Sequence, residues 1–177
     1  MNKILEASFE FTMAIEGVYF DDPAGGPTKY GVSLKAHAQD IGDRDGDGDI
    51  DADDVKLLEK EDAMKLFAEK YFRGDLSAPV ALMYADMAYH HGAVRAVKLL
   101  QTACNALGVP SGAADGKIGP KTRRAIQNAS TALPEALIAE VQRHRLRFMR
   151  GLSNWEPNQN GWERRCFLCA LAAKELV

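Results

Sequence analysis

The sequence contains no apolar run that approaches the length of a membrane span, so stable membrane insertion is not expected. Near the N-terminus, Glu6 and Glu10 interrupt what would be the apolar core of a signal peptide. We therefore expect a chain that is made in the cytoplasm and whose route out is supplied by another component. Its 177 residues suffice for one domain, or for a larger lobe with a small second one.

Cysteine is scarce as well. The three cysteines, Cys104, Cys166 and Cys169, have neither the number nor the spacing of a secreted disulfide scaffold. No histidines stand in register with them to complete a zinc site. Cys166 and Cys169 lie three apart in an apolar helical pattern, so we interpret the cysteines as small core residues.

Motifs typical of nucleic-acid binding are also absent, including zinc fingers and basic zippers, so no nucleic-acid partner is expected. The formal net charge of -3 hides an asymmetry: acidic residues concentrate in 43–54, whereas the region from Lys117 onward is rich in Lys and Arg. A basic surface suits an anionic polymer, and the bacterial cell wall is one. Arg143, Arg145, Arg147 and Arg150 are most simply a solvated helix face that could add attraction to such an envelope.

Alternating β-branched runs are nearly missing, whereas apolar residues recur at three- and four-residue spacing over most of the chain. We therefore predict a mainly α fold. The predicted helices cover 3–16, 34–41, 52–71, 80–107 with a break near Gly92, 120–129, 134–150 and 162–177. The Gly-, Pro- and Asp-rich segment after the first helix could form a small hairpin from 18–20 and 30–33.

The stretch DRDGDGDIDADD, residues 43–54, has the spacing of an EF-hand calcium loop. Gly48 permits the sharp bend, Ile50 supplies the apolar position after it, and a predicted helix flanks each side. The side-chain ligands would be Asp43, Asp45, Asp47, Asp51 and Asp54, with Asp49 giving its backbone carbonyl. The alternative is a solvated acidic turn, but such a turn requires none of these accompanying features.

The last position of this loop is Asp54 rather than glutamate, and its shorter carboxylate leaves weaker affinity or tolerance of Mg²⁺ open. We expect Ca²⁺ to act as a structural or regulatory ion, because the repulsion among seven carboxylates destabilises the loop without a cation. If the affinity lies between the free calcium levels of the cytosol and the envelope, folding or activity would rise on release.

Glu16 ends the first helix and opens the segment EGVYFDDPAGGPTKYGV. Beside aromatic residues, a carboxylate at a helix end can be desolvated and its pKa raised. The order Glu-Gly-x-Tyr, Asp-Pro, Gly-Gly, Thr and Tyr-Gly-Val resembles the active-site segment of glycoside hydrolase family 108 lysozymes, many of them phage endolysins. Later stretches, YADMAYHHGAVRAVKLLQ, DGKIGPKTRRAI and GWERR, resemble the following helices and peptidoglycan-binding region of that family.

The resemblance implies a lysozyme-like helical fold with the small β-hairpin at the active site. It divides the chain into a catalytic lobe, 1–92, that includes the acidic loop, and a closely packed peptidoglycan-binding lobe, 93–177. It also implies hydrolysis of the β-1,4 bond between N-acetylmuramic acid and N-acetylglucosamine in bacterial peptidoglycan, in the periplasm or cell wall. Glu16 would be the general acid. Nothing in the pattern requires more than a monomer.

The second catalytic group is less clearly marked. Asp21 and Asp22 are candidates to position water or stabilise positive charge, with Asp22 matching the family pattern, and Thr28 could orient a water molecule. An aspartate before proline also shapes turns, and a threonine at a strand start also packs. For substrate binding the resemblance indicates Tyr19 and Tyr30.

The sequence His90-His91-Gly92 stands where the family tends to carry asparagine before the glycine. A histidine here, such as His90, could bind sugar, but it is more simply a residue that satisfies a neighbouring carbonyl. Trp155 and Trp162 could stack on sugar rings, although Trp162 is more simply an anchor for the last helix.

Two other functions are compatible with these residues. A lytic transglycosylase needs one glutamate and lets a group of the substrate trap the cation, so its product lacks the water that hydrolysis adds. A non-catalytic, calcium-dependent wall-binding module would bind peptidoglycan without turnover, unchanged by Glu16→Gln.

Overall fold

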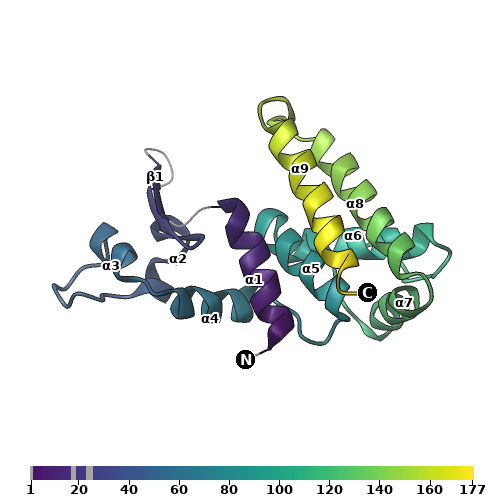
Figure 1. Ribbon diagram of the computed structural model, residues 1–177, viewed down its shortest axis with the longest axis horizontal. Helices are drawn as coiled ribbons and strands as arrows, with labels where there is room; N and C mark the ends of the chain where they lie inside the picture. Colours follow the sequence, from purple (N-terminus) through teal and green to yellow (C-terminus); the bar gives the residue numbers. More distant parts are fainter. Residues whose placement is uncertain (1, 17–18, 23–25) are drawn as a thin grey trace. The chain divides into compact units, whose positions relative to one another are not determined.

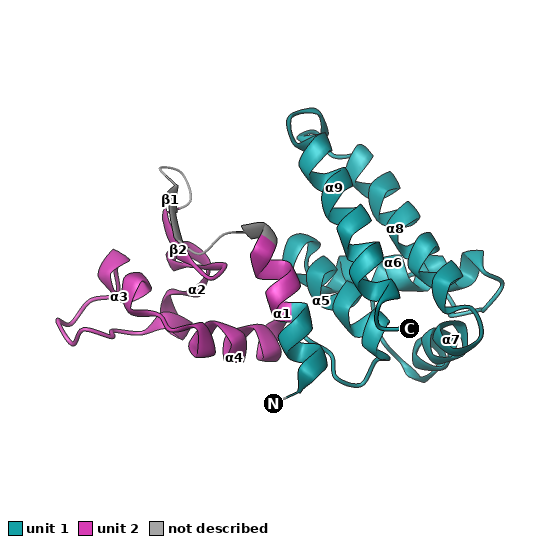
Figure 2. Cartoon of the chain, viewed as in Figure 1, with its two compact units in different colours: residues 1–8, 71–177 teal, residues 9–70 magenta. Residues whose placement is uncertain are grey.

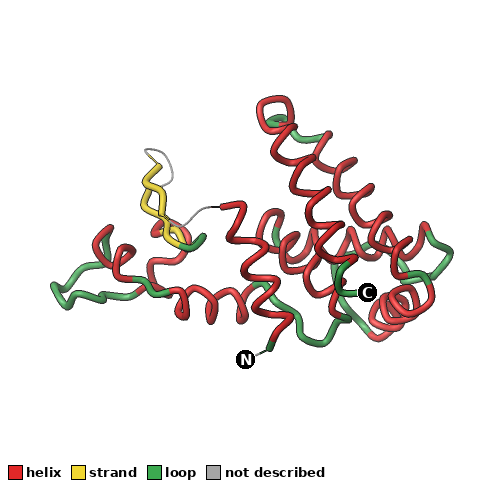
Figure 3. The backbone as a smooth tube through the Cα atoms, viewed as in Figure 1, coloured by secondary structure: helices red, strands yellow, loops and turns green. Residues whose placement is uncertain are grey.

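The computed structural model describes residues 2–16, 19–22 and 26–177, and the side chains of 2–14 and 26–177. Within these residues the chain forms nine helices and one three-stranded sheet (Figures 1 and 3). The prediction of a mainly α fold with a small β element is therefore confirmed. No helix in the described part of the chain is long and apolar enough to span a membrane.

The backbone divides into two compact units (Figure 2). One contains residues 9–70 and is called the hairpin unit here; the other contains residues 1–8 and 71–177 and is called the helical unit. The division falls within the first helix, α1 (Lys3–Glu16). It assigns 71–92 to the same unit as the C-terminal helices, and the functional division at residue 92 stays a prediction.

The hairpin unit carries the sheet and three short helices. Strands β1 (Tyr19–Asp22), β2 (Gly26–Lys29) and β3 (Val32–Ser33) are antiparallel in that order, with Phe20 opposite Thr28 and Lys29 opposite Val32. They are followed by α2 (Leu34–Ile41), α3 (Ala52–Leu57) and α4 (Lys60–Lys70).

The predicted pairing of 18–20 with 30–33 is wrong in its second strand, and Val18 lies outside the described residues. Tyr30 and Gly31 both have positive φ, 50° and 73°, which produces a tight two-residue turn between β2 and β3. Residues 26–29 therefore form the partner of β1, and Val32 and Ser33 add a third strand. Asn, Asp or Gly usually occupies such a turn, so Tyr30 gave no signal for it.

The predicted helix 52–71 is two helices, α3 and α4. Leu58 between them is extended, with φ -56° and ψ 130°, and is 2% exposed. The carboxylate of Asp62 accepts the N–H of Glu59 at 3.2 Å, which satisfies a backbone donor at the start of α4. Because the apolar spacing continues through Leu58, periodicity alone did not reveal the break.

The helical unit consists of α5 (Ala78–His91), α6 (Ala93–Ala106), α7 (Pro120–Ala132), α8 (Pro134–Arg150) and α9 (Trp155–Lys174), together with the start of α1. The predicted break at Gly92 is confirmed: its φ of 82° ends α5, and its N–H bonds to Ala88 O. Helix α9 begins at Trp155 rather than at the predicted Trp162, and α7 extends to Ala132.

The core of the helical unit surrounds α5, which is buried from Pro79 to Ala88 and packs against α6 and α9. A helix that is apolar on all sides belongs in an interior. All three cysteines are free and buried, which confirms the interpretation of Cys104, Cys166 and Cys169 as core residues. Burial raises the pKa of the Cys104 and Cys166 thiols to about 11, so they stay protonated at neutral pH.

Candidate active site and acidic loop

The predicted catalytic segment begins at the last residue of α1 and continues through the sheet. Glu16 is the last residue of α1, and the backbones of Tyr19 and Asp22 form the ends of β1. The side chains of these three residues lie outside the described ones. The backbone register places Asp22 opposite Gly26, and Thr28 two pairs further along, opposite Phe20.

Thr28 and Tyr30 are half-buried. The Lys29 ammonium lies 5.5 Å from the centre of the Tyr30 ring and donates to Lys56 O at 2.5 Å, which ties the sheet to α3. An ammonium near an aromatic face is attracted to it, so the ring at the turn is held in place. The sheet thus offers a half-buried hydroxyl and phenol beside the strand that follows Glu16.

The acidic loop folds around its own backbone amides. One carboxylate oxygen of Asp43 accepts the N–H of Gly46 at 2.6 Å and the other accepts the N–H of Gly48 at 3.0 Å. Gly46 and Gly48 have φ of 79° and 100°, which confirms the bend expected at Gly48. The carboxylate oxygens gather into two groups, within each of which they lie no more than 4.8 Å apart: Asp43, Asp45 and Asp47, and Asp49, Asp51 and Asp54.

Asp54 is the buried member of this set, at 1% exposure. Its two oxygens accept the backbone N–H groups of Arg44 at 2.5 Å and Asp51 at 2.7 Å. With Asp51 it forms a capping box at the start of α3. The bond from Arg44, followed by that from Asp51, lowers the pKa of Asp54. Asp54 therefore stabilises the end of the loop through hydrogen bonds of its own.

The exposed carboxylates repel one another. The negative charge of Asp47, followed by desolvation, raises the pKa of Asp49. At Asp45 the N–H of Asp47 has the largest influence and lowers the pKa, but desolvation and the neighbouring carboxylates outweigh it. A cation would relieve this repulsion, and carboxylate oxygens are ligands that hard cations prefer.

A buried charge cluster in the helical unit was not predicted from the sequence. Asp86 and Arg145 are 0% exposed and Arg165 is 4% exposed. Arg145 Nη1 donates to one oxygen of Asp86 at 2.6 Å, and Arg165 donates from Nη2 and Nε to the other at 2.6 and 2.9 Å. Burial alone would raise the pKa of Asp86, but the charges of Arg145 and Arg165 lower it.

The assignment of Arg145 to a solvated helix face is therefore wrong. Arg145 follows the buried Val141 and precedes the buried Met149, each four residues away, so it lies on the apolar stripe of α8. Arg143, Arg147 and Arg150 are exposed, as predicted. Two features of the sequence could have indicated the buried cluster: the four-residue spacing of Arg145 from apolar residues and the single aspartate within the apolar run of α5.

His90 and His91 both face Arg145. Arg145 Nε donates to His91 Nε2 at 3.1 Å, and Arg145 Nη2 lies 3.3 Å from His90 Nδ1. A guanidinium has no acceptor, so the proton of each ring lies on the other nitrogen, which is Nε2 in His90. Burial followed by the charges of Arg165 and Arg145 lowers the pKa of His90 to about 4.

His90 is thus neutral at pH 7 and retains an Nε2–H. Its ring also packs edge-on against Trp162, with centroids 5.6 Å apart, and Trp162 lies 5.9 Å from Trp155. These contacts agree with Trp162 as an anchor of α9. They give His90 a structural role, while its predicted contact with substrate stays a prediction.

A second buried network organises the connector between α6 and α7. Gln101 is 1% exposed; its Nε2 donates to Asp115 Oδ1 at 2.9 Å and Thr122 Oγ1 at 3.1 Å, and its Oε1 accepts the N–H of Gly116 at 2.9 Å. A Cβ at Gly116 would lie 2.7 Å from Val94 Cγ1. Residues of the motif that resembles peptidoglycan-binding modules therefore fix the conformation of the connector between α6 and α7 in this chain.

Comparison with known proteins relates two consecutive regions of the chain to known families. The model of the family described as Glycosyl hydrolase 108 matches residues 9–92, and that of the Predicted Peptidoglycan domain matches residues 95–174. No curated protein matches the chain. Among solved structures, the structure of Brucella abortus SagA is similar, with a TM-score of 0.79 and 27% identity, over 99% of this chain and 97% of that one. Residues 9–92 thus resemble glycosyl hydrolase family 108, and together with the peptidoglycan domain that follows they support a lysozyme-like glycoside hydrolase that acts on peptidoglycan.

Proposed function

We propose that the protein is a muramidase that hydrolyses the β-1,4 bond between N-acetylmuramic acid and N-acetylglucosamine, with Glu16 as the general acid. The observation that carries the proposal is the position of Glu16 at the end of α1, within the region that matches the hydrolase family and directly before the sheet. Glu16 protonates the leaving oxygen while positive charge develops on the sugar ring.

The strands that follow supply the second group. Asp22 stabilises the developing charge or positions water, and the Thr28 hydroxyl, two pairs along the same register, orients that water. Tyr19 and Tyr30, at the start of β1 and just after β2, bind the sugar. If Asp22 is the second group, Asp22→Asn abolishes turnover and Thr28→Val reduces it; the reverse order of effects would assign the role to Thr28.

The test is digestion of purified peptidoglycan, with released fragments identified by mass. Glu16→Gln is expected to lower the rate at least about 100-fold, because general-acid catalysis contributes that much or more. Glu10→Gln is the matched control: it removes an exposed carboxylate from the same helix, whose partner is Lys60. Anhydro ends would instead identify a lytic transglycosylase, and binding without release in wild type would identify a wall-binding module.

We also infer that the acidic loop binds Ca²⁺, with Mg²⁺ as a weaker alternative. The donor set fits a hard cation because every side-chain ligand is a carboxylate, and Asp49 adds its backbone carbonyl oxygen; the side-chain ligands are Asp43, Asp45, Asp47, Asp51 and Asp54. The bound ion would neutralise the loop and stabilise the start of α3. It takes no part in the proton transfer.

The melting temperature at increasing free Ca²⁺ tests this inference. We expect a rise that saturates at or below millimolar concentration, because a ligand that binds only the folded state stabilises it. Asp47→Asn should weaken the effect, whereas Asp53→Asn, which changes an exposed aspartate outside both carboxylate groups, should leave it intact. No shift up to millimolar Ca²⁺ would contradict the inference.

A further inference from the structure

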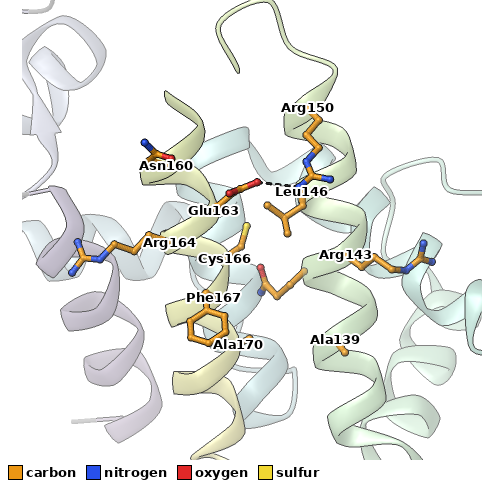
Figure 4. A pocket seen from close by; sticks show the side chains of 11 residues that line it. Ala139, Arg143, Leu146, Arg150, Asn160, Glu163, Arg164, Cys166, Phe167 and Ala170 are labelled. Carbon is orange, nitrogen blue, oxygen red and sulfur yellow. Dashed lines mark hydrogen bonds and ion pairs between the residues drawn. The ribbon is translucent and has the colours of Figure 1, made fainter. Parts of the chain in front are cut away.

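A groove of about 770 Å³ lies between α8 and α9 in the helical unit (Figure 4). It is called the α8–α9 groove here. Ala139 and Leu146 contribute apolar surface from α8, and Phe167 and Ala170 from α9. The Phe167 side chain is 67% exposed, which is unusual for a phenylalanine. The groove therefore presents an apolar surface and an accessible aromatic ring.

The side chain of Gln142 also lines this groove, and its amide lacks partners. Gln142 is 5% exposed, and neither its Nε2 nor its Oε1 has a hydrogen-bond partner among the described residues. The Cys169 thiol lies close enough for the amide to influence its pKa, but a thiol is only a weak hydrogen-bond partner. A buried amide with both functions unpaired costs folding free energy. Such a group suits a ligand that offers one donor and one acceptor, as a peptide bond does.

The charged residues of the groove favour an anion. Arg143, Arg150 and Arg164 line the groove together with Glu163, but Arg143 already donates to both oxygens of Glu140 at 2.6 to 3.1 Å. Arg150 donates to Glu163 at 3.0 Å across one end of the groove, as the dashed line in Figure 4 shows. Arg164 is exposed and forms no ion pair among the described residues. In Figure 4 the Arg164 side chain extends from α9 on the side away from α8, and because it is flexible and has no ion pair it can turn to a bound carboxylate.

We propose that the α8–α9 groove binds the peptide stem of peptidoglycan, a short acidic peptide with small apolar side chains. A carboxylate of the peptide would meet Arg164, and its alanine methyl groups would contact the apolar surface beside Phe167. A peptide bond would pair with the Gln142 amide when that buried side chain turns toward the groove. The inference rests on the proposed function, and it assigns the contact with the wall peptide to a surface within the region that matches the peptidoglycan domain.

The first experiment is an NMR titration of the full-length ¹⁵N-labelled chain with N-acetylated L-Ala-γ-D-Glu-diaminopimelyl-D-Ala. We expect saturable shifts confined to residues 139–150 and 160–170, with an affinity that falls as salt is added. An uncharged N-acetylglucosamine oligosaccharide is the comparison ligand. Equal shifts of the groove with this sugar would assign it to the glycan strand, and no shifts with millimolar peptide would overturn the proposal.

Two variants with matched controls locate the contacts. Arg164→Glu should weaken binding about tenfold, whereas Arg147→Glu, the same charge reversal on an exposed residue outside the groove, should not. Phe167→Ser should weaken it about fivefold, whereas Leu171→Ser, which removes another exposed apolar side chain of α9, should leave it unchanged. Equal effects of variant and control would overturn the assignment.

Gln142→Leu separates a binding role from a structural one. If the amide is retained for a ligand, this variant melts no lower than wild type but loses at least about tenfold in affinity for the peptide. If the amide serves the fold, the variant melts lower and binds normally, which refutes the proposal. Self-association that depends on Phe167 would instead identify a second copy of the chain as the occupant.

The peptide-binding measurements can be interpreted independently of the proposed muramidase reaction. A wild type that binds the peptide in the groove but releases no sugar fragments from peptidoglycan refutes the proposed muramidase and leaves the groove assignment in place. Conversely, release of fragments without peptide binding refutes the groove assignment alone.

Discussion

The buried charge cluster makes the sharpest prediction about stability. Asp86→Ala removes the only carboxylate that Arg145 contacts among the described residues, and two hydrogen bonds of Arg165 as well. Because Arg145 is 0% exposed, water does not replace the lost partner. Removing one partner of a buried ion pair costs about 3–5 kcal/mol.

This loss is a large share of the stability of a domain, which is about 5–15 kcal/mol. For a chain of this size, each kcal/mol corresponds to about 2–4 °C, so Asp86→Ala should lower the melting temperature by about 6–20 °C. The control is Asp75→Ala. Asp75 also lies between two arginines, Arg73 and Arg123, but its side chain is 37% exposed. Surface ion pairs contribute at most about 1 kcal/mol.

The assay is urea unfolding followed by circular dichroism at pH 7, with both variants and wild type. Comparison of Asp86 with Asp75 isolates the effect of burial on stability, because each carboxylate pairs with two arginines but only Asp86 is buried. A loss at Asp86 no greater than that at Asp75 would refute the reasoning. The lowered pKa of Asp86 also determines how its contribution to the free energy of unfolding depends on pH. This contribution is complete above the ordinary aspartate pKa and disappears as pH falls through the lowered pKa of Asp86.

Three further predictions concern the two histidines, the α6–α7 connector and the acidic loop. Burial, followed by the charge of Arg145, lowers the pKa of His91 to about 3, and the pKa of His90 is lowered to about 4. Below about pH 6.5 the unfolded chain therefore binds protons at these histidines that the folded chain does not bind. The melting temperature should fall between pH 7 and pH 4 for this reason. An equal slope in His90→Gln/His91→Gln would contradict this origin. Gly116→Ala should cost about 2–3 kcal/mol in urea unfolding, because its φ is 85° and Val94 blocks the new methyl group, whereas Gly119→Ala, with nothing within 4 Å, should cost under about 1 kcal/mol. Asp54→Ala should destabilise the protein by about 1–2 kcal/mol even in chelator, because Asp54 caps α3 through its own hydrogen bonds; no loss in calcium-free thermal melts would leave it only the role of a metal ligand.

The sequence by itself determined the features that depend on local spacing. The period of apolar residues predicted the helical fold, Gly92 predicted the break between α5 and α6, and the alternation of aspartate and glycine predicted the bend at Gly48. Each of these follows from the conformation or burial of residues close together in the chain. The resemblance of the segment after Glu16 added the hydrolase family, which the family comparison confirmed.

Only the tertiary structure decided which polar residues lie inside. Asp86 and Arg145 are 59 positions apart and Gln101 and Thr122 are 21 apart, so no local pattern pairs them. The strand partner of β1 likewise depended on a turn at Tyr30, a residue that rarely adopts positive φ. Burial turns these side chains into obligatory partners, because a charge or amide removed from water needs another group to satisfy it. Gln142 lies inside without such a group, which only packing of α8 against α9 could reveal.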